Sequence, residues 1–196
     1  MNICIFGDSI AWGANDFELG GWTEHLKNNL YTQERSHDVY NLGISGDATT
    51  QAIKRINVEA SVRKADVIVF ALGINDSAFL KSRGERWTPL AEFKNNLALL
   101  FEAAQKFTEI IIFVGLTPVD ESKTMPAPWA PDYFVDSKTT KEYNAVIREF
   151  CEDKKIQFIS MDDVLTPDDL SDGLHPNTAG HKKMFEKIQK ELHAII

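Results

Sequence analysis

The sequence predicts an α/β protein in which a parallel sheet of about five strands is covered by helices on both faces. Short apolar runs alternate along the chain with segments of helical periodicity, a pattern typical of right-handed β-α-β units. The run at 67–72 is apolar at consecutive positions, as expected of a strand that helices cover on both sides. With 196 residues, the chain is expected to form one domain over residues 1–196.

Each predicted strand is a short apolar run that precedes a turn or a helical segment. The first run ends in a glycine, Gly7, so that the next side chains stand at the carboxyl end of the strand. In open α/β sheets, ligands bind at that edge. The five runs are residues 3–6, 39–42, 67–72, 110–114 and 156–159.

The predicted helices are recognised by caps and apolar stripes. Thr88 is expected to cap a helix that has Pro89 at its first position, and Asn177 to cap the last helix. Apolar residues recur at helical spacing from 90 to 104 and again from 143 to 151. Weaker patterns predict helices at 22–31 and 49–63.

The composition of the chain argues against several classes of function. The formal net charge of −8 argues against a nucleic-acid partner, since such proteins depend on clustered Lys and Arg. No run approaches the roughly 20 apolar residues of a membrane span, and a strand that begins at Asn2 leaves little room for a signal peptide, so a cytoplasmic location is expected. Cys4 and Cys151 make no disulfide framework and are expected to be buried thiols.

No cofactor or metal is expected. Gly7 and Gly13 do not complete a dinucleotide-binding Gly-x-Gly-x-x-Gly pattern, and no phosphate-binding Gly-Lys-Ser/Thr follows. The acidic pairs at 162–163 and 168–169 lack the alternating acidic residues and the glycine of a calcium loop, and they favour a solvated surface. The four histidines other than His175 are expected to be structural or exposed.

The segment 116–136 is predicted to be a long, lid-like loop. It contains four prolines, and loops of this length within compact domains are often lids or binding loops. Its aromatic residues either line a pocket or pack the loop onto the body of the protein. They are Trp129, Tyr133 and Phe134.

Four segments that each follow an apolar run carry side chains suited to nucleophilic catalysis. Parallel strands would bring all four to the same edge of the sheet. A serine hydroxyl needs a base to take its proton and donors to hold the developing oxyanion. The segments are Gly7-Asp8-Ser9, Ile44-Ser45-Gly46-Asp47, Gly73-Ile74-Asn75-Asp76 and Asp172-Gly173-Leu174-His175-Pro176.

The residue types in these segments fit that chemistry. The three-residue spacing from Asp172 to His175 lets one tight turn point the carboxylate at the imidazole and orient it as a base for Ser9. The absence of a side chain at Gly46 lets a backbone N–H approach a substrate closely. The Asn75 amide and the Ser9 backbone N–H would be further oxyanion donors. Asp76, the next residue, is expected to brace this loop and not to take part in the chemistry.

The four segments, in this order, resemble the four sequence blocks of the GDSL, or SGNH, hydrolase family, and with the strands between them the resemblance covers nearly the whole chain. It implies a flavodoxin-like three-layer α/β/α sandwich and ester or thioester hydrolysis without metal. Carried over by position, Ser9 is the nucleophile, His175 the base and Asp172 its orienting carboxylate. The resemblance likewise implies that Ser9, Gly46 and Asn75 form the oxyanion hole.

The substrate is not fixed by these motifs. We expect a small-molecule ester with a short acyl chain or an O-acetyl group, and a lysophospholipid or thioester is the alternative within the family. A non-catalytic, flavodoxin-like ligand-binding module is the alternative of another class. Asp8, Trp12 and Trp129 are candidate substrate contacts, although Asp8 suits a hydrogen bond to nearby backbone better. The oligomeric state is not readable from the sequence.

Overall fold

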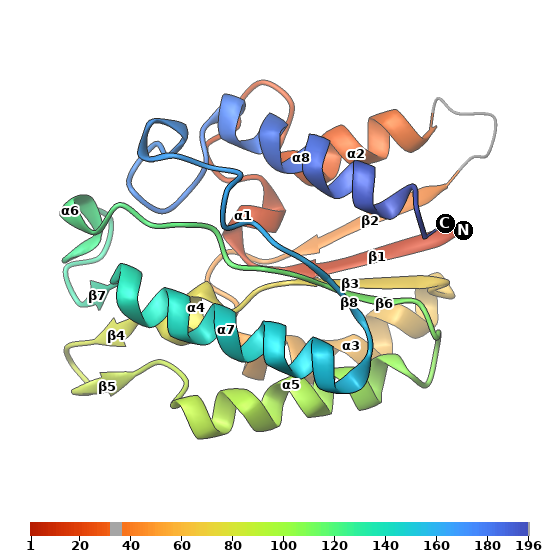
Figure 1. Ribbon diagram of the computed structural model, residues 1–196, viewed down its shortest axis with the longest axis horizontal. Helices are drawn as coiled ribbons and strands as arrows, with labels where there is room; N and C mark the ends of the chain where they lie inside the picture. Colours follow the sequence, from red (N-terminus) through yellow and green to blue (C-terminus); the bar gives the residue numbers. More distant parts are fainter. Residues whose placement is uncertain (32–36, 196) are drawn as a thin grey trace.

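The computed structural model describes residues 1–31 and 37–195, and it contains a five-stranded parallel sheet in the order β2-β1-β3-β6-β8 (Figure 1). When the five strands are numbered along the chain, this order is 2-1-3-4-5, the order of flavodoxin-like folds. The predicted parallel sheet is therefore confirmed. The strands are β1 (Asn2–Gly7), β2 (Asp38–Gly43), β3 (Val67–Ala71), β6 (Ile111–Val114) and β8 (Gln157–Ile159).

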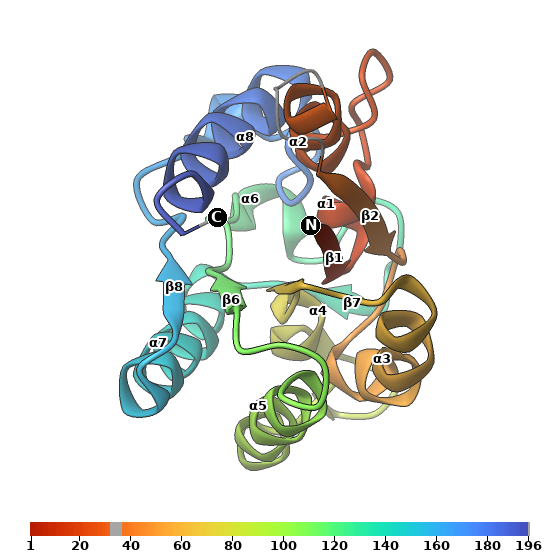
Figure 2. The ribbon, with the colours of Figure 1, turned by 90° about the vertical axis from the view of Figure 1, so that its right-hand side faces the viewer.

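Helices cover both faces of this sheet, which confirms the three-layer sandwich (Figure 2). Two helices, α2 and α8, pack together on one face, while α3, α5 and α7 pack side by side on the other. The helices of the first face are α2 (Trp22–Tyr31) and α8 (Thr178–Leu192). Those of the second are α3 (Thr49–Arg63), α5 (Leu90–Ala104) and α7 (Ser137–Lys154).

The core lies on both sides of the central strands. Residues 3–6 of β1 are completely buried, as consecutive apolar residues in a doubly covered strand should be. Phe6, Phe70 and Phe113 form a row across three adjacent strands, with ring centroids 5.9 Å and 4.8 Å apart. Cys4 and Cys151 are buried free thiols, as predicted.

Most predicted helix boundaries agree with the structure. Asn177 caps α8 through a 2.9 Å bond that its Oδ1 accepts from Gly180 N–H. Helix α5 begins at Leu90 with Pro89 as its cap, one residue later than expected, because Pro89 has an extended ψ of 144°. None of the described helices is long and apolar enough to cross a membrane.

The segment 116–136, predicted to be a loop, contains a helical turn and a strand, α6 (Glu121–Thr124) and β7 (Tyr133–Phe134). Strand β7 pairs antiparallel with β4 (Phe79–Leu80), which in turn pairs with β5 (Glu85–Arg86). This small three-stranded sheet, which the sequence did not predict, stands beyond the carboxyl ends of the parallel strands (Figure 1). It therefore borders the edge where the four sequence segments meet.

Candidate active site

Ser9 stands at the carboxyl end of β1, as the first residue of a short helix, α1 (Ser9–Trp12). Gly7 is required at the preceding bend, since a Cβ there would lie 2.2 Å from the Ala11 Cβ. Asp8 caps the helix by accepting a 2.9 Å hydrogen bond from Ile10 N–H. The strand end and the cap together fix the position of Ser9 at the edge of the sheet.

The turn 172–175 brings an imidazole to Ser9 from 166 residues away in the chain. Ser9 Oγ and His175 Nε2 are 2.8 Å apart, and His175 Nδ1 is 2.8 Å from Asp172 Oδ2. The other carboxylate oxygen of Asp172 accepts bonds from the backbone N–H groups of Leu174 and His175, at 3.0 and 2.8 Å. Gly173 adopts a φ of +91°, which lets the turn close this tightly.

The electrostatics of this turn keep Asp172 ionised. Burial by itself would raise the pKa of Asp172, but the hydrogen bonds from the His175 ring and backbone, and the attraction of the imidazolium, outweigh it. They lower the pKa of Asp172 to about 2. A carboxylate that stays charged holds the proton of His175 on Nδ1, which leaves Nε2 free to accept one from Ser9.

Asn15 is a contact of this turn that the sequence analysis missed. Its side-chain N–H donates to Asp172 Oδ2 at 3.1 Å, so that this oxygen is shared between Asn15 and His175. Asn15 adopts a φ of +67°, a conformation that Asn tolerates better than most residues. No pattern in the sequence distinguishes Asn15 from an ordinary loop residue, because its partner lies 157 residues away.

The loops after β2 and β3 lie beside Ser9 and are tied to each other. Gly46 lines a cleft together with Ser9 and has a φ of +84°, and a Cβ built there meets no atom within 4 Å. Asn75 belongs to the helical turn α4 (Ile74–Ser77), where its Nδ2 donates to Asp47 O at 2.8 Å. Arg55 binds the side chain of Asp47 at 2.9 Å and steadies the loop that carries Gly46.

Asp76, next to Asn75, braces the two loops. Its carboxylate accepts bonds from Thr49 N–H, at 3.0 Å, and from the Thr49 hydroxyl, at 2.5 Å, at the first turn of α3. Burial raises the pKa of Asp76 against these opposing hydrogen bonds. Its place beneath the loops agrees with the bracing role that the sequence favoured over a chemical one.

Ser9, the turn 172–175 and the loops that carry Gly46 and Asn75 border one cleft of about 520 Å³. Trp129, from the segment 116–136, packs on His175 with ring centroids 4.9 Å apart. The aromatic side of the cleft is completed by Trp87 and Tyr133, and the Tyr133 hydroxyl donates to Asn75 Oδ1. Other lining residues include Ser9, Ser45, Gly46, Asn75, Asp172 and His175.

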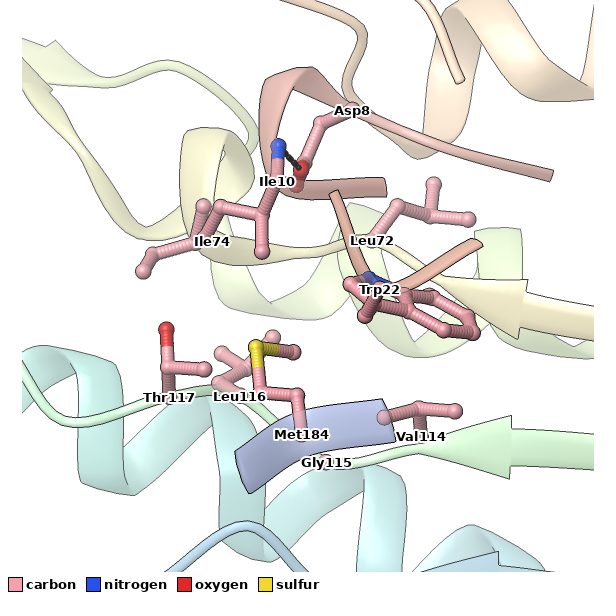
Figure 3. A pocket seen from close by; sticks show the side chains of 11 residues that line it. Asp8, Ile10, Trp22, Leu72, Ile74, Val114, Gly115, Leu116, Thr117 and Met184 are labelled. Carbon is pink, nitrogen blue, oxygen red and sulfur yellow. Dashed lines mark hydrogen bonds between the residues drawn. The ribbon is translucent and has the colours of Figure 1, made fainter. Parts of the chain in front are cut away.

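Two of the candidate substrate contacts do not line the cleft. Asp8 is 2% exposed and lines a separate cavity of about 20 Å³, together with Ile10, Trp22 and Met184 (Figure 3). Burial raises the pKa of Asp8 to about 7 against the opposing bond from Ile10. Trp12 ends α1 and is exposed, outside the set of cleft-lining residues. The bond that Asp8 accepts from Ile10 N–H is the hydrogen bond to nearby backbone that the sequence favoured for it.

Within the described residues, no group of His, Cys, Asp or Glu is arranged to hold a metal ion. The acidic pairs have other partners, since Asp162 binds Arg148 and Asp169 binds Lys183 at 2.7 Å. His181 is fully buried, with Nε2 2.9 Å from Ala14 O. His25 lies 3.3 Å from Asp16, a partner that the sequence did not indicate.

Comparison with known proteins identifies the family. Residues 5–183 match the sequence profile of the GDSL-like Lipase/Acylhydrolase family. The chain belongs to this family. A GDSL esterase/lipase of Arabidopsis thaliana is 27% identical over 210 residues, which cover 97% of this chain and 85% of the relative. This GDSL-family chain is thus a hydrolase that acts on ester bonds, and the alternative of a non-catalytic module is not supported.

Solved structures show the same fold. A lipase/acylhydrolase from Enterococcus faecalis superposes with a TM-score of 0.79 at 24% identity, over 98% of this chain and 95% of that one. An acetylxylan esterase from Geobacillus stearothermophilus superposes with a TM-score of 0.75 at 22% identity, over 97% and 93% of the two chains. The GDSL-family chain therefore shares its three-layer sandwich with these proteins.

Proposed function

We propose that this protein is a serine esterase of short-chain acyl or O-acetyl esters in which Ser9 is the nucleophile, His175 the base and Asp172 its orienting carboxylate. The observation that carries the proposal is the hydrogen-bonded series from Ser9 Oγ through the His175 ring to Asp172, with both links at 2.8 Å. Ser9, His175 and Asp172 all line the cleft, where a substrate has access to the Ser9 hydroxyl.

In the first half of the reaction, Ser9 Oγ attacks the carbonyl carbon of the ester while His175 Nε2 takes the hydroxyl proton. The carbonyl oxygen becomes an oxyanion, which the backbone N–H groups of Ser9 and Gly46 and the Asn75 amide stabilise. The tetrahedral intermediate then expels the alcohol. His175 returns the proton to the leaving oxygen, and the acyl group stays on Ser9.

In the second half, water replaces the alcohol. His175 takes a proton from the water as its oxygen attacks the acyl carbon, and the same donors hold the second oxyanion. Collapse of that intermediate breaks the bond to Ser9 Oγ, which recovers its proton from His175. The products are a carboxylic acid, an alcohol and the free enzyme, so the reaction consumes one water molecule and needs no oxidant or reductant.

We expect short acyl groups because the acyl chain on Ser9 would lie in the cleft that Ser9 lines, and not in the core. The separate cavity between α1 and the ends of β3 and β6, which Ser9 does not line, is about 20 Å³ and has room for about one water molecule. A long chain would have to lie in the open cleft with one side exposed to water. The aromatic wall of Trp87 and Trp129 suits a flat apolar or sugar face on the alcohol side.

A series of p-nitrophenyl esters from acetate to palmitate tests the proposed substrate class. We expect kcat/KM to be highest for acetate or butyrate and to fall as the chain lengthens, since each added methylene gains little burial. Acetylated xylose would show whether a sugar is accepted as the alcohol. A kcat/KM that rises steadily to palmitate would contradict the short-chain proposal and favour the lysophospholipid alternative.

A further inference from the structure

We propose that Tyr133 is a positioning residue that holds the Asn75 amide in the orientation needed for an oxyanion donor. The inference rests on the proposed function, because it assigns a partner to a group of that catalytic site. Tyr133 lies in the segment 116–136, 58 residues away from Asn75 in the chain. Its hydroxyl donates a hydrogen bond to Asn75 Oδ1.

The two ends of the Asn75 amide have different partners, and these partners fix its orientation. Nδ2 donates one N–H to the carbonyl oxygen of Asp47 at 2.8 Å, while Oδ1 accepts from the Tyr133 hydroxyl. If the amide turned over, Oδ1 would face the Asp47 carbonyl, and two acceptors would repel each other. In the observed orientation the second N–H of Nδ2 is left for a substrate oxyanion.

The Tyr133 hydroxyl also strengthens the donor that it positions. A hydrogen bond accepted by an amide oxygen polarises the group and makes its N–H protons better donors. Burial, and the nearby charges of Asp8 and Asp76, raise the pKa of Tyr133, so the phenol keeps its proton throughout the range in which an esterase works. The donor to Asn75 is therefore present at every such pH.

The small antiparallel sheet explains how Tyr133 reaches Asn75. The helical turn α4 carries Asn75, and β4 follows it directly in the chain. Strand β7 pairs with β4 so that Tyr133 stands opposite Leu80. The ring of Tyr133 is held by Trp87 and Trp129, at centroid distances of 6.2 and 6.4 Å. This sheet, which lies outside the parallel core, thus joins the segment 116–136 to the oxyanion site.

The Tyr133→Phe variant removes the hydroxyl and keeps the ring that packs against the tryptophans. We expect kcat for p-nitrophenyl acetate to fall roughly tenfold, the factor that corresponds to about 1.4 kcal/mol of transition-state free energy. KM should change less than about twofold, because an oxyanion donor acts mainly in the transition state. In an Asn75→Ala background the same change should alter kcat by less than about twofold.

Tyr143→Phe is the matched control, because Tyr143, like Tyr133, is a buried tyrosine whose hydroxyl donates a hydrogen bond. Its acceptor is the backbone oxygen of Thr88. We expect Tyr143→Phe to leave kcat unchanged in both backgrounds. If Tyr133→Phe lowers kcat by the same factor with and without the Asn75 side chain, Tyr133 acts through the general structure and the proposal is overturned. An unchanged kcat in the wild-type background would overturn it equally.

A measurement without substrate separates this proposal from the proposed function. In ¹⁵N-labelled protein, the Asn75 side-chain amide is assigned by its loss in Asn75→Ala. We expect that amide pair to shift in Tyr133→Phe and to stay in place in Tyr143→Phe. In the wild type, a slowly exchanging Tyr133 hydroxyl proton should show cross-relaxation to the Asn75 side chain. The absence of both signals would overturn the positioning role, whatever the protein hydrolyses.

Discussion

The Ser9→Ala variant is expected to lose about 10⁴- to 10⁶-fold in kcat for p-nitrophenyl acetate, the range that removal of a serine nucleophile produces. The variant retains the cleft and the oxyanion donors, so a small residual rate above that of water should remain. The fold should be unaffected, because the Ser9 hydroxyl bonds to His175 and the helix cap is supplied by Asp8. Release of p-nitrophenolate in a stopped-flow or plate assay measures the loss.

Ser61→Ala is a suitable control for this experiment, since Ser61 is an exposed serine on α3, on the face of the sheet opposite α2 and α8. It should have the activity of the wild type. Equal unfolding midpoints in urea for the three proteins would show that any loss of rate is chemical. A Ser9→Ala protein as active as the wild type would exclude Ser9 as the nucleophile.

The Asp172→Asn variant is expected to lose about 10³- to 10⁴-fold in kcat, because the substitution reverses the tautomer of His175. The Asn oxygen can keep the backbone bonds from Leu174 and His175. The amide nitrogen would then replace the carboxylate oxygen that faces His175 Nδ1 and Asn15. The ring would move its proton to Nε2, which could then donate to Ser9 but no longer accept from it.

A pH–rate profile distinguishes this explanation from simple damage to the turn. In the variant, the rate should rise with pH as hydroxide replaces the missing base, a dependence on hydroxide that the wild type should not show. Asp163→Asn, at an exposed aspartate on the surface, is the control and should behave as the wild type. An Asp172→Asn protein that keeps the wild-type rate and profile would remove Asp172 from the proposed mechanism.

The features that were predicted from the sequence all depend on local pattern. Apolar runs and helical stripes located the five parallel strands and the five long helices, and the family resemblance implied the three-layer sandwich. The positions Ser9, Gly46, Asn75, Asp172 and His175 were selected because each follows a strand, and the structure brings them to one cleft. Their catalytic roles stay predictions, as does the cytoplasmic location.

The features that were not predicted depend on contacts between distant, patternless segments. The strands of the small sheet are two residues long, too short to show any periodicity, so neither β4 nor β7 could be recognised. Asn15 and Tyr133 act through partners 157 and 58 residues away. Asp8 makes the hydrogen bond to nearby backbone that the sequence favoured for it, with Ile10 N–H, and Trp12 stands outside the cleft.

The central claim is that an acyl group is carried on Ser9 during the reaction. Mass spectrometry of protein that has been mixed with p-nitrophenyl acetate and quenched in acid within milliseconds tests this most directly. We expect one acetyl group per chain, located on the peptide that contains Ser9 and absent in Ser9→Ala. Rapid hydrolysis with no acetylated peptide, or with the acetyl group on another residue, would contradict the account.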